Sequence, residues 1–472
     1  MSVTGIEADP GSFRDPAGFV YYQGGELYRR INPSYWQHYD ALLESGLYYF
    51  LVEQKWLVAH DELEADAGQQ SRTIKPVRIP FISYPYEWCF SQLKDAALLT
   101  LTIQRAALEH GLTLKDASAY NVQFHQGRPV FIDTLSFERY QEGLPWVAYQ
   151  QFCKHFLGPL ALMAYCDVRL ARLQTSYVDG IPLDLVASLL PARTRLQFGL
   201  GIHLHLHARQ QQQKGATQVD EKKLRTALSR QAMLALVDNL YRTVEKLRWR
   251  PDKTEWDDYY QSNNNYSRKA FADKEMHVDL FLKQSQPDEV WDLGANDGHF
   301  SKIAARHASR VISWDVDPVC VERHYRRQKR AEKTNILPLM LDMTNPSPAL
   351  GWRNQERASF TQRASCDTAM ALGLVHHLAI ANNLPLSDIA ACWATQCRYL
   401  IVEFVPKTDS QVKKLLQSRE DVFADYHADG FERAFGAYFT LQAKQPIRDS
   451  ERLLYLFRSS STDQSQKNNR AP

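Results

Sequence analysis

Residues 289–300 read EVWDLGANDGHF, an apolar run that carries Asp292 and then breaks into a glycine-rich turn. The apolar run has the length and composition of a buried strand, and the residues after the turn read as the start of a helix. Gly294 and Gly298 permit backbone conformations that side chains disfavour, and Asn296 is a residue type that tolerates a left-handed conformation. We therefore expect a strand–turn–helix unit whose bare turn passes close under a ligand, next to the free N–H groups of the helix.

Further strands follow this unit, and acids stand at their ends. The segment 310–315 ends in Asp315, and the segment 336–341 is followed by Asp342. Strands and helices alternate from residue 252 onward, which is typical of a parallel sheet with covering helices. An acid at the tip of the second strand is placed to bind both hydroxyls of a ribose. We expect Asp342 to lie beside the exocyclic amine of an adenine.

These motifs resemble those of the class I S-adenosylmethionine-dependent methyltransferases, whose first motif reads acid-x-Gly-x-Gly-x-Gly. Asn296 replaces the middle glycine. The resemblance covers about 200 residues and implies a Rossmann-like, seven-stranded α/β domain with S-adenosyl-L-methionine as cofactor. The cofactor-binding residues that it implies are Asp292, Gly294, Asn296, Gly298, Asp315, Asp342 and Leu372. A nicotinamide-binding domain is the alternative, but its GxGxxG pattern and phosphate-binding signature are missing here.

The fourth predicted strand, 367–374, runs into His376 and His377. Methyl transfer is an in-line displacement, so a base is needed only when the acceptor is a hydroxyl or a similar acid. We name both histidines as candidate catalytic bases at the carboxyl edge of the sheet; alternatively, they only begin a helix. We expect O-methylation of a small molecule or glycan-type acceptor. The sequence has no Asn-Pro-Pro-Tyr-type motif and no Pro-Cys dipeptide, so we do not expect a nucleic-acid partner.

Two further segments are candidates for the acceptor side of the site. Residues 256–267, rich in aromatic and amide side chains, form either a lid or a surface loop with turn-forming asparagines. The segment 403–406 follows the fifth predicted strand, 399–404, and is expected to face the acceptor.

The N-terminal half contains a second pattern. Asp116 is followed by Asn121, by a predicted hairpin at 126–128, and by Asp133. This spacing resembles the catalytic segment of kinase-like phosphotransferases, in which the first Asp orients a hydroxyl and the other two residues hold magnesium. The residues flanking both aspartates depart from the kinase pattern, and no paired strand lysine is evident. We therefore expect a degenerate α+β kinase-like domain with a vestigial site, which serves substrate binding or regulation.

Composition and the spacing of motifs indicate how the chain is divided into domains. We expect a kinase-like domain at 1–205, a helical connector at 206–250, the methyltransferase domain at 251–460 and a disordered tail at 461–472. The 472 residues carry a net charge of +2, and the seven cysteines form no CxxC pair. The longest apolar run, 156–165, is too short to span a bilayer, and no signal peptide is evident, so we expect a cytoplasmic protein.

Three histidines, His203, His205 and His207, alternate with leucines. On a strand they would share one face and could bind a metal, whereas in a helix they would diverge. We expect no metal site, because no acid or cysteine stands near them.

The arrangement of the two halves also resembles bacterial methyltransferases grouped with rhizobial nodulation proteins that modify lipo-oligosaccharide signals, which implies a glycan acceptor. Two alternatives remain at this point: a non-catalytic, cofactor-binding regulatory protein, and a bifunctional protein with an active N-terminal phosphotransferase.

Overall fold

The structure is a computed structural model that describes residues 6–63, 72–206, 229–250, 266–331, 334–363, 365–417 and 419–460. The chain forms two units. Unit 1 comprises residues 1–250 with 349–358, and unit 2 comprises residues 251–348 with 359–472. None of the described helices combines the length and the apolar character that a bilayer crossing requires.

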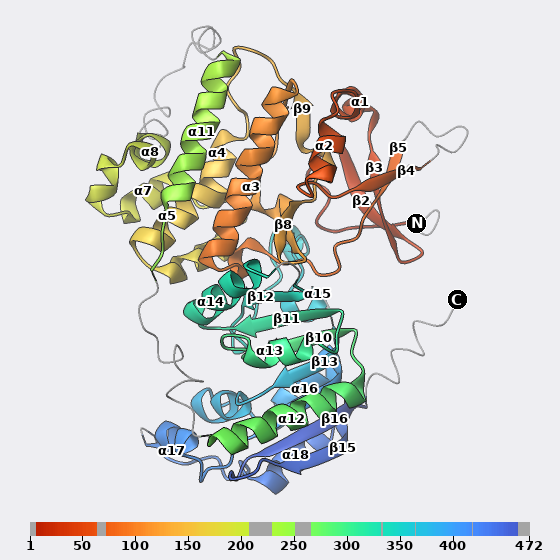
Figure 1. Cartoon of the computed structure of the whole chain (residues 1–472), viewed down its shortest axis with the longest axis vertical. Helices are drawn as coiled ribbons and strands as arrows, with labels where there is room; N and C mark the ends of the chain where they lie inside the picture. The colour runs from red at the N-terminus through yellow and green to blue at the C-terminus, as the bar shows by residue number, and fades with distance from the viewer. Residues whose placement is uncertain are drawn as a thin grey trace. The chain divides into compact units, whose positions relative to one another are not determined.

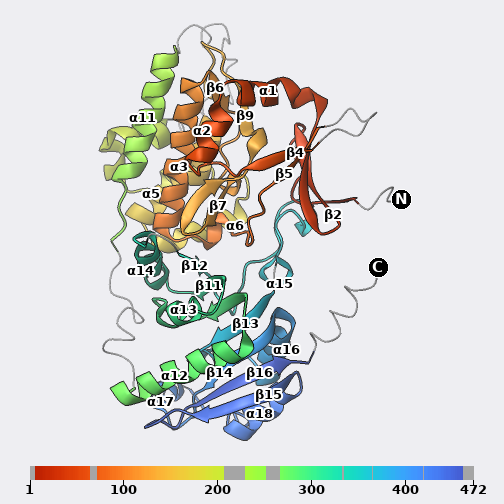
Figure 2. The ribbon, with the colours of Figure 1, turned by 45° about the vertical axis from the view of Figure 1, so that its right-hand side comes forward.

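Unit 1 begins with an antiparallel sheet in the order β1-β2-β3-β5-β4 (Figures 1 and 2). Its strands are β1 (Ile6–Ala8), β2 (Gly18–Gln23), β3 (Glu26–Ile31), β4 (His60–Leu63) and β5 (Arg72–Pro76). Gly24 and Gly25 both have a positive φ in the turn between β2 and β3, where Cβ atoms would be disfavoured. The helices α1 (Trp36–Glu44) and α2 (Leu47–Glu53) connect β3 to β4.

The helical part of unit 1 is organised around α3 (Phe90–Glu109), whose apolar residues Leu93, Ala97 and Leu101 are buried. The helix α11 (Arg230–Lys246) packs against α3, and its buried residues include Val237 and Val244. Lys94 Nζ on α3 donates a hydrogen bond to the Leu247 carbonyl at 2.9 Å. This helix therefore belongs to unit 1.

The segment 112–139, which contains Asp116, Asn121 and Asp133, forms two small sheets after α3. The strand β6 (Leu112–Leu114) pairs with β9 (Phe137–Arg139), and β7 (Val122–His125) pairs with β8 (Arg128–Phe131). Gln126 and Gly127 have positive φ values of 49° and 75°, so the hairpin predicted at this position is confirmed.

The remaining described helices of unit 1 are short, and η denotes 3-10 or π-helical turns. They are η1 (Pro33–Tyr35), η2 (Pro85–Glu87), η3 (Ala119–Asn121), η4 (Thr134–Ser136), α4 (Tyr149–Phe152), η5 (Cys153–Leu157), α5 (Gly158–Tyr165), η6 (Val168–Arg172), α6 (Leu173–Ser176), α7 (Leu183–Leu189), η7 (Ala192–Leu196), α8 (Phe198–Leu200), η8 (Gly201–Leu206) and η10 (Trp352–Asn354).

Unit 2 contains the seven-stranded sheet that the sequence predicts, in the order β12-β11-β10-β13-β14-β16-β15. Its strands are β10 (Glu289–Leu293), β11 (Arg310–Asp315), β12 (Ile336–Met340), β13 (Cys366–Ala371), β14 (Cys397–Phe404), β15 (Phe439–Pro446) and β16 (Leu453–Ser459). The first five are parallel, and β16 runs antiparallel to both β14 and β15. The strand order reverses at β10, which lies between β11 and β13, and ligands bind at such switch points in open α/β sheets.

The described helices of unit 2 are α12 (Arg268–Ser285), α13 (His299–Ala304), α14 (Pro318–Lys329), α15 (Phe360–Arg363), η11 (His377–Ala381), α16 (Leu386–Gln396), α17 (Ser410–Leu416) and α18 (Ala428–Gly436). Figure 1 shows α12 in front of the sheet, where it packs against α13 and against β13, β14 and β16. Its buried residues Val278 and Phe281 join Val290, Val311 and Ile401 of the strands in one apolar core. This core fixes the carboxyl ends of the strands, where the candidate site lies.

Candidate active site

The glycine-rich turn joins β10 to α13 and has the backbone that its sequence predicts. Gly294, Asn296 and Gly298 have positive φ values of 74°, 50° and 82°. Asparagine is among the few non-glycine residues that adopt this conformation readily, which explains its place in the motif.

The space beside the turn is only partly available to a ligand. A Cβ on Gly298 would lie 2.0 Å from His324 Cε1 of α14, so glycine is required there because the protein itself packs against the turn. At Gly294 the nearest atom, Leu374 Cδ1, would be 3.4 Å away, which is ordinary contact. Helix α14 thus supplies the close approach that excludes a Cβ at Gly298, and the role of Gly298 in cofactor binding stays a prediction.

Asp292, on β10, points into the protein. Its side chain accepts a hydrogen bond from Ser301 Oγ at 2.6 Å, and the residue is only 2% exposed. Burial, together with the nearby Asp315 carboxylate, raises the pKa of Asp292 to about 7 although Ser301 opposes the shift. Ser313 Oγ donates to Ser301 Oγ at 2.8 Å, so Asp292 ends a short polar chain that joins β10, α13 and β11.

Asp315 holds the turn from the neighbouring strand. It is the last residue of β11, and its two carboxylate oxygens accept from the Asn296 N–H at 2.7 Å and the Asp317 N–H at 2.8 Å. Burial raises the pKa of Asp315 to about 6, although the backbone N–H groups lower it. The Val316 N–H is a third backbone donor to this side chain, so of the roughly four lone-pair sites of a carboxylate about one remains for another donor.

The parallel register brings the remaining cofactor candidates to the same edge. Asp315 is level with Met340 of β12, and Leu293 is level with Ala371 of β13. Asp342, just beyond β12, accepts from both the N–H and the Oγ1 of Thr344. Leu372, just beyond β13, belongs to the apolar core.

The two histidines follow β13 at this edge, and their rings lie 4.1 Å apart. His376 is 1% exposed, and neither ring nitrogen has a hydrogen-bond partner in the described part of the chain. Burial, with neighbouring positive charge, lowers the pKa of His376 well below its usual value and that of His377 to about 4. His377 is half-buried, so it is the more accessible base of the pair.

A buried network of charges beside the histidines has no signal in the sequence. Lys274 Nζ of α12 lies 2.8 Å from Glu403 Oε2 of β14, and Arg452 Nη1 lies 3.4 Å from Glu403 Oε1. Tyr266 Oη donates to Glu403 and accepts from Arg452 Nη1 at 2.7 Å. Asp409, the N-cap of α17, accepts from Arg452 Nε at 2.8 Å.

The expectation that Glu403 faces the acceptor is wrong, because its side chain is fully buried and bound by Lys274, Arg452 and Tyr266. Although burial opposes it, the two cations lower the pKa of Glu403 to about 2. The lid predicted at 256–267 lies outside the described residues up to position 265, and Ser267 is the N-cap of α12.

The predicted kinase-like residues meet in unit 1. Asp116 forms a side-chain hydrogen bond with Asn121; its pKa is raised, mainly by burial and next by the charge of Asp133. Arg29 Nη1 of β3 lies 2.6 Å from Asp133 Oδ1, and Ser136 Oγ donates to Asp133 Oδ2 at 2.5 Å. Arg29 of β3 is thus the cation that pairs with Asp133.

Asp15 extends this acidic cluster. It lies 3.2 Å from Lys115 Nζ and 3.7 Å from Arg29 Nη2. Within the described residues no group of three or more His, Cys, Asp and Glu side chains is arranged to hold a metal.

The alternating histidines are not on a strand. His203 and His205 lie in the π-helical turn η8 and are buried. The ring of His203 bonds with Tyr149 Oη and Asn239 Oδ1, each at 2.7 Å, and the ring of His205 bonds with Thr194 Oγ1. These bonds explain the two histidines as parts of the core, and His207 lies outside the described residues.

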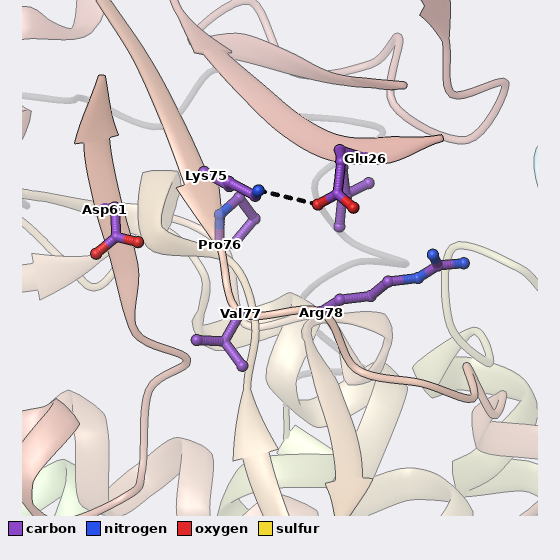
Figure 3. Close-up of a pocket in the computed structure, with 7 residues that line it drawn as sticks. Glu26, Asp61, Lys75, Pro76, Val77 and Arg78 are labelled. Carbon is purple, nitrogen blue, oxygen red and sulfur yellow. Dashed lines mark ion pairs between the residues drawn. The ribbon is translucent and has the colours of Figure 1, made fainter. Parts of the chain in front are cut away.

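A pocket of about 210 Å³ opens on the sheet of unit 1 (Figure 3). It is lined by Glu26, Leu27, Asp61, Lys75, Pro76, Val77 and Arg78. Lys75 Nζ and Glu26 Oε2 form an ion pair at 2.9 Å across it, and none of the predicted site residues lines it.

Comparisons with known proteins give one strong match. No family model matches the chain. Over 459 residues the chain is 36% identical to the nodulation protein NoeA of Rhizobium meliloti (strain 1021), and the match covers 95% of this chain and 96% of that protein.

The similarities to solved structures are weak. The N-methyltransferase NodS from Bradyrhizobium japonicum WM9, in complex with S-adenosyl-L-homocysteine, has a TM-score of 0.32 and 14% identity over 43% of this chain and 91% of that chain. The magnesium protoporphyrin IX methyltransferase ChlM from Synechocystis PCC 6803 has a TM-score of 0.30 and 16% identity over 43% of this chain and 97% of that chain. At TM-scores this low, neither similarity carries an argument about function.

Proposed function

The chain belongs to the family of the nodulation protein NoeA, and we propose that it is an S-adenosyl-L-methionine-dependent methyltransferase whose catalytic unit is unit 2. Its acceptor is a hydroxyl of a small molecule or glycan.

One observation carries this proposal: a half-buried carboxylate at the tip of β11 holds the left-handed turn after β10 through the Asn296 N–H. Asp315 keeps accepting capacity beyond its three backbone bonds, from Asn296, Val316 and Asp317, so it fits a ribose hydroxyl by the chemistry of its oxygens. A dinucleotide needs a turn that lets its pyrophosphate come close to the backbone. At Gly298, His324 fills the space into which a Cβ would project, so that side of the turn is not open to a pyrophosphate.

We assign different residues to different parts of the cofactor. Asp315 accepts the ribose hydroxyls, Asp342 lies at the adenine end, and Gly294 with Asn296 shapes the turn at the methionine end. Asp292 acts through Ser301, because its buried carboxylate holds the start of α13 in place. Bound at this edge, the cofactor supplies an electrophilic methyl group on a sulfonium.

His377 is the proposed base. A histidine whose pKa lies near 4 is neutral at physiological pH and can accept a proton from a hydroxyl as that hydroxyl attacks. His376 packs beneath it as a positioning residue, since its ring is buried beside that of His377.

A transfer assay with methyl-labelled S-adenosylmethionine and a pool of oligosaccharide acceptors tests the proposal. We expect labelled product from the wild type and a 100- to 10,000-fold lower rate for His377→Gln, which is the usual range for loss of a general base. The variant Asp388→Ala, which removes an exposed carboxylate on α16, serves as the matched control and should leave the rate unchanged. Equal rates for His377→Gln and the wild type would contradict the role of this histidine.

For unit 1 we propose a kinase-like domain that has lost phosphotransfer and serves substrate binding or regulation. The ion pair of Arg29 with Asp133 and the bond from Ser136 support this, because together they occupy both oxygens that would bind magnesium. Titration of the full chain with Mg-ATP distinguishes the alternatives. Tight binding that is lost in Asp133→Ala would favour the bifunctional protein with an active phosphotransferase.

A further inference from the structure

The connection between β12 and β13 departs from the usual crossover of a parallel sheet. Such strands are normally joined by a helix that covers the sheet. Here the chain leaves unit 2 after Pro348, contributes residues 349–358 to unit 1, and returns to unit 2 at Ser359. We call residues 349–358 the insert hairpin.

The insert hairpin has its own defined fold. Leu350 and Arg357 exchange both backbone hydrogen bonds, each at 3.0 Å. Arg353 and Asn354 turn the chain with positive φ values of 59° and 55°. The Trp352 N–H donates to Glu356 Oε2 at 3.0 Å, so the turn also orients the Glu356 carboxylate.

Glu356 fixes the insert hairpin to the loop between β1 and β2. Arg14 donates to both of its carboxylate oxygens, from Nε at 2.6 Å and from Nη2 at 2.9 Å. The Glu356 side chain is only 2% exposed, whereas that of Arg14 is 51% exposed. Burial opposes ionisation, but the bond from Arg14 lowers the pKa of Glu356 overall. Gly11 permits this close approach, since a Cβ there would lie 2.7 Å from the Glu356 carbonyl oxygen.

The insert hairpin also lies on the loop 116–121. The guanidinium carbon of Arg357 lies 4.1 Å from the ring centroid of Tyr120, which belongs to η3 between Asp116 and Asn121. Asp15, the neighbour of Arg14, pairs with Lys115 at the other side of the acidic cluster. The hairpin is therefore attached to two of the loops that form this cluster.

The return point of the insert is fixed within unit 2. The Ala358 N–H donates to Tyr84 Oη in unit 1 at 3.0 Å, and two residues later the ring of Phe360 is buried in unit 2. The Phe360 ring centroid lies 5.1 Å from that of Trp291 and 5.5 Å from that of Trp314. These tryptophans immediately precede Asp292 and Asp315, the acids of the proposed cofactor site.

We propose that the insert hairpin couples the cofactor site of unit 2 to the acidic cluster of unit 1, so that cofactor binding slows local opening around the loop 116–121. This inference rests on the proposed function. The hairpin is held within unit 1 by buried contacts, and two residues after it the ring of Phe360 is buried in unit 2. A change in the stability of one site can therefore pass along the chain to the other, and such coupling is reciprocal.

Hydrogen–deuterium exchange on the full chain, with and without saturating S-adenosylhomocysteine, tests the coupling. In the wild type we expect the amides of Leu350 and Arg357, and those of the loop 116–121, to exchange about fivefold more slowly with ligand. In Arg14→Ala the hairpin amides should exchange faster without ligand, and the ligand should no longer protect them. Glu356→Gln repeats the test from the partner side, in case one variant fails to fold.

Arg139→Ala is the matched control, because this exposed arginine of unit 1 contacts neither the hairpin nor the loop and should respond as the wild type does. Ligand binding measured by calorimetry without any change in exchange at residues 350–357 would overturn the coupling alone. Absence of ligand binding would contradict the proposed function and the coupling with it.

Discussion

The two acids at the ends of β10 and β11 have the same side chain and different roles. Asp292 is buried and bonded to Ser301, whereas Asp315 is half-buried and keeps accepting capacity. The proposed roles follow from environment: burial penalises the charged form of both acids, and Asp315 ends β11 beside the turn that we propose as the cofactor site.

The affinity for S-adenosylmethionine should fall in acid through Asp315. Its pKa is raised to about 6, and the neutral acid accepts hydroxyl hydrogen bonds less well than the carboxylate does. Calorimetric titrations between pH 8 and 5 should show the dissociation constant rising as pH falls through 6. In Asp315→Asn the affinity should be weaker at pH 8 and nearly independent of pH; a wild-type affinity that is flat across this range would contradict the assignment.

The ionised Asp292 side chain should lower the free energy of unfolding at neutral pH. Its folded pKa of about 7 exceeds the unfolded value of about 3.9, so the folded state binds more protons and stability falls as pH rises from about 4 to 7. Asp292→Asn should raise the free energy of unfolding at pH 8 by roughly 2–4 kcal/mol and change it little at pH 4. Urea unfolding at both pH values measures this, and a variant less stable than the wild type at pH 8 would refute it.

The residues of the turn were predictable because their constraints are local. A positive φ at Asn296 and an acid at the tip of β11 follow from spacing within one strand–turn–helix unit. The packing of His324 against Gly298 was not predictable, since it depends on how α14 lies against a turn that precedes it by many residues.

At the scale of elements, the buried charges tie α12, β14, α17 and the start of β16 together. Removing Lys274 takes the cation at 2.8 Å from the buried Glu403 carboxylate and leaves it with Arg452 at 3.4 Å, so the cost of burying this charge is less well offset. Lys274→Met should therefore lower the free energy of unfolding by about 3–5 kcal/mol.

The double variant Lys274→Met/Glu403→Gln tests the reason for that loss. It should regain part of the stability, because the buried carboxylate that lost its nearer cation is replaced by a neutral amide, while Arg452 keeps its ion pair with Asp409. Urea unfolding compares the three proteins. A double variant less stable than Lys274→Met would show that the charges do more than neutralise each other.

The order of elements was largely predictable, and their meeting points were not. Alternating strands and helices indicated the parallel sheet, and the hairpin at Gln126 and Gly127 formed as predicted. The spacing of His203 and His205 left a strand and a helix open, and the residues form a π-helical turn whose imidazoles bond with Tyr149, Asn239 and Thr194. Lys274, Glu403 and Arg452 lie far apart in sequence, so no local pattern indicates their contact.

At the scale of the whole molecule, the two proposed sites differ in whether their acids are available to a ligand. In unit 1 the cation Arg29 bonds with an acid that would otherwise be available to a metal. Arg29→Met should lower the unfolding temperature in EDTA by several degrees, which corresponds to about 1–2 kcal/mol. Because the freed carboxylate can then accept a divalent ion, magnesium should restore part of the loss.

The wild type serves as the reference for this thermal-unfolding measurement, and its unfolding temperature should not respond to magnesium. A second variant, Arg29→Met/Asp133→Asn, should be insensitive as well. Stabilisation of the wild type by magnesium, lost in Asp133→Asn, would instead indicate an active metal site in unit 1.

If the edge formed by β10 and β11 binds an adenosyl sulfonium, calorimetric titration of the full chain should distinguish S-adenosylmethionine from a nicotinamide dinucleotide. We expect saturable binding of S-adenosylmethionine only, weakened by roughly 1–3 kcal/mol in Asp315→Ala because hydroxyl hydrogen bonds are lost. Binding of the dinucleotide, or of S-adenosylmethionine with equal affinity to both proteins, would contradict it.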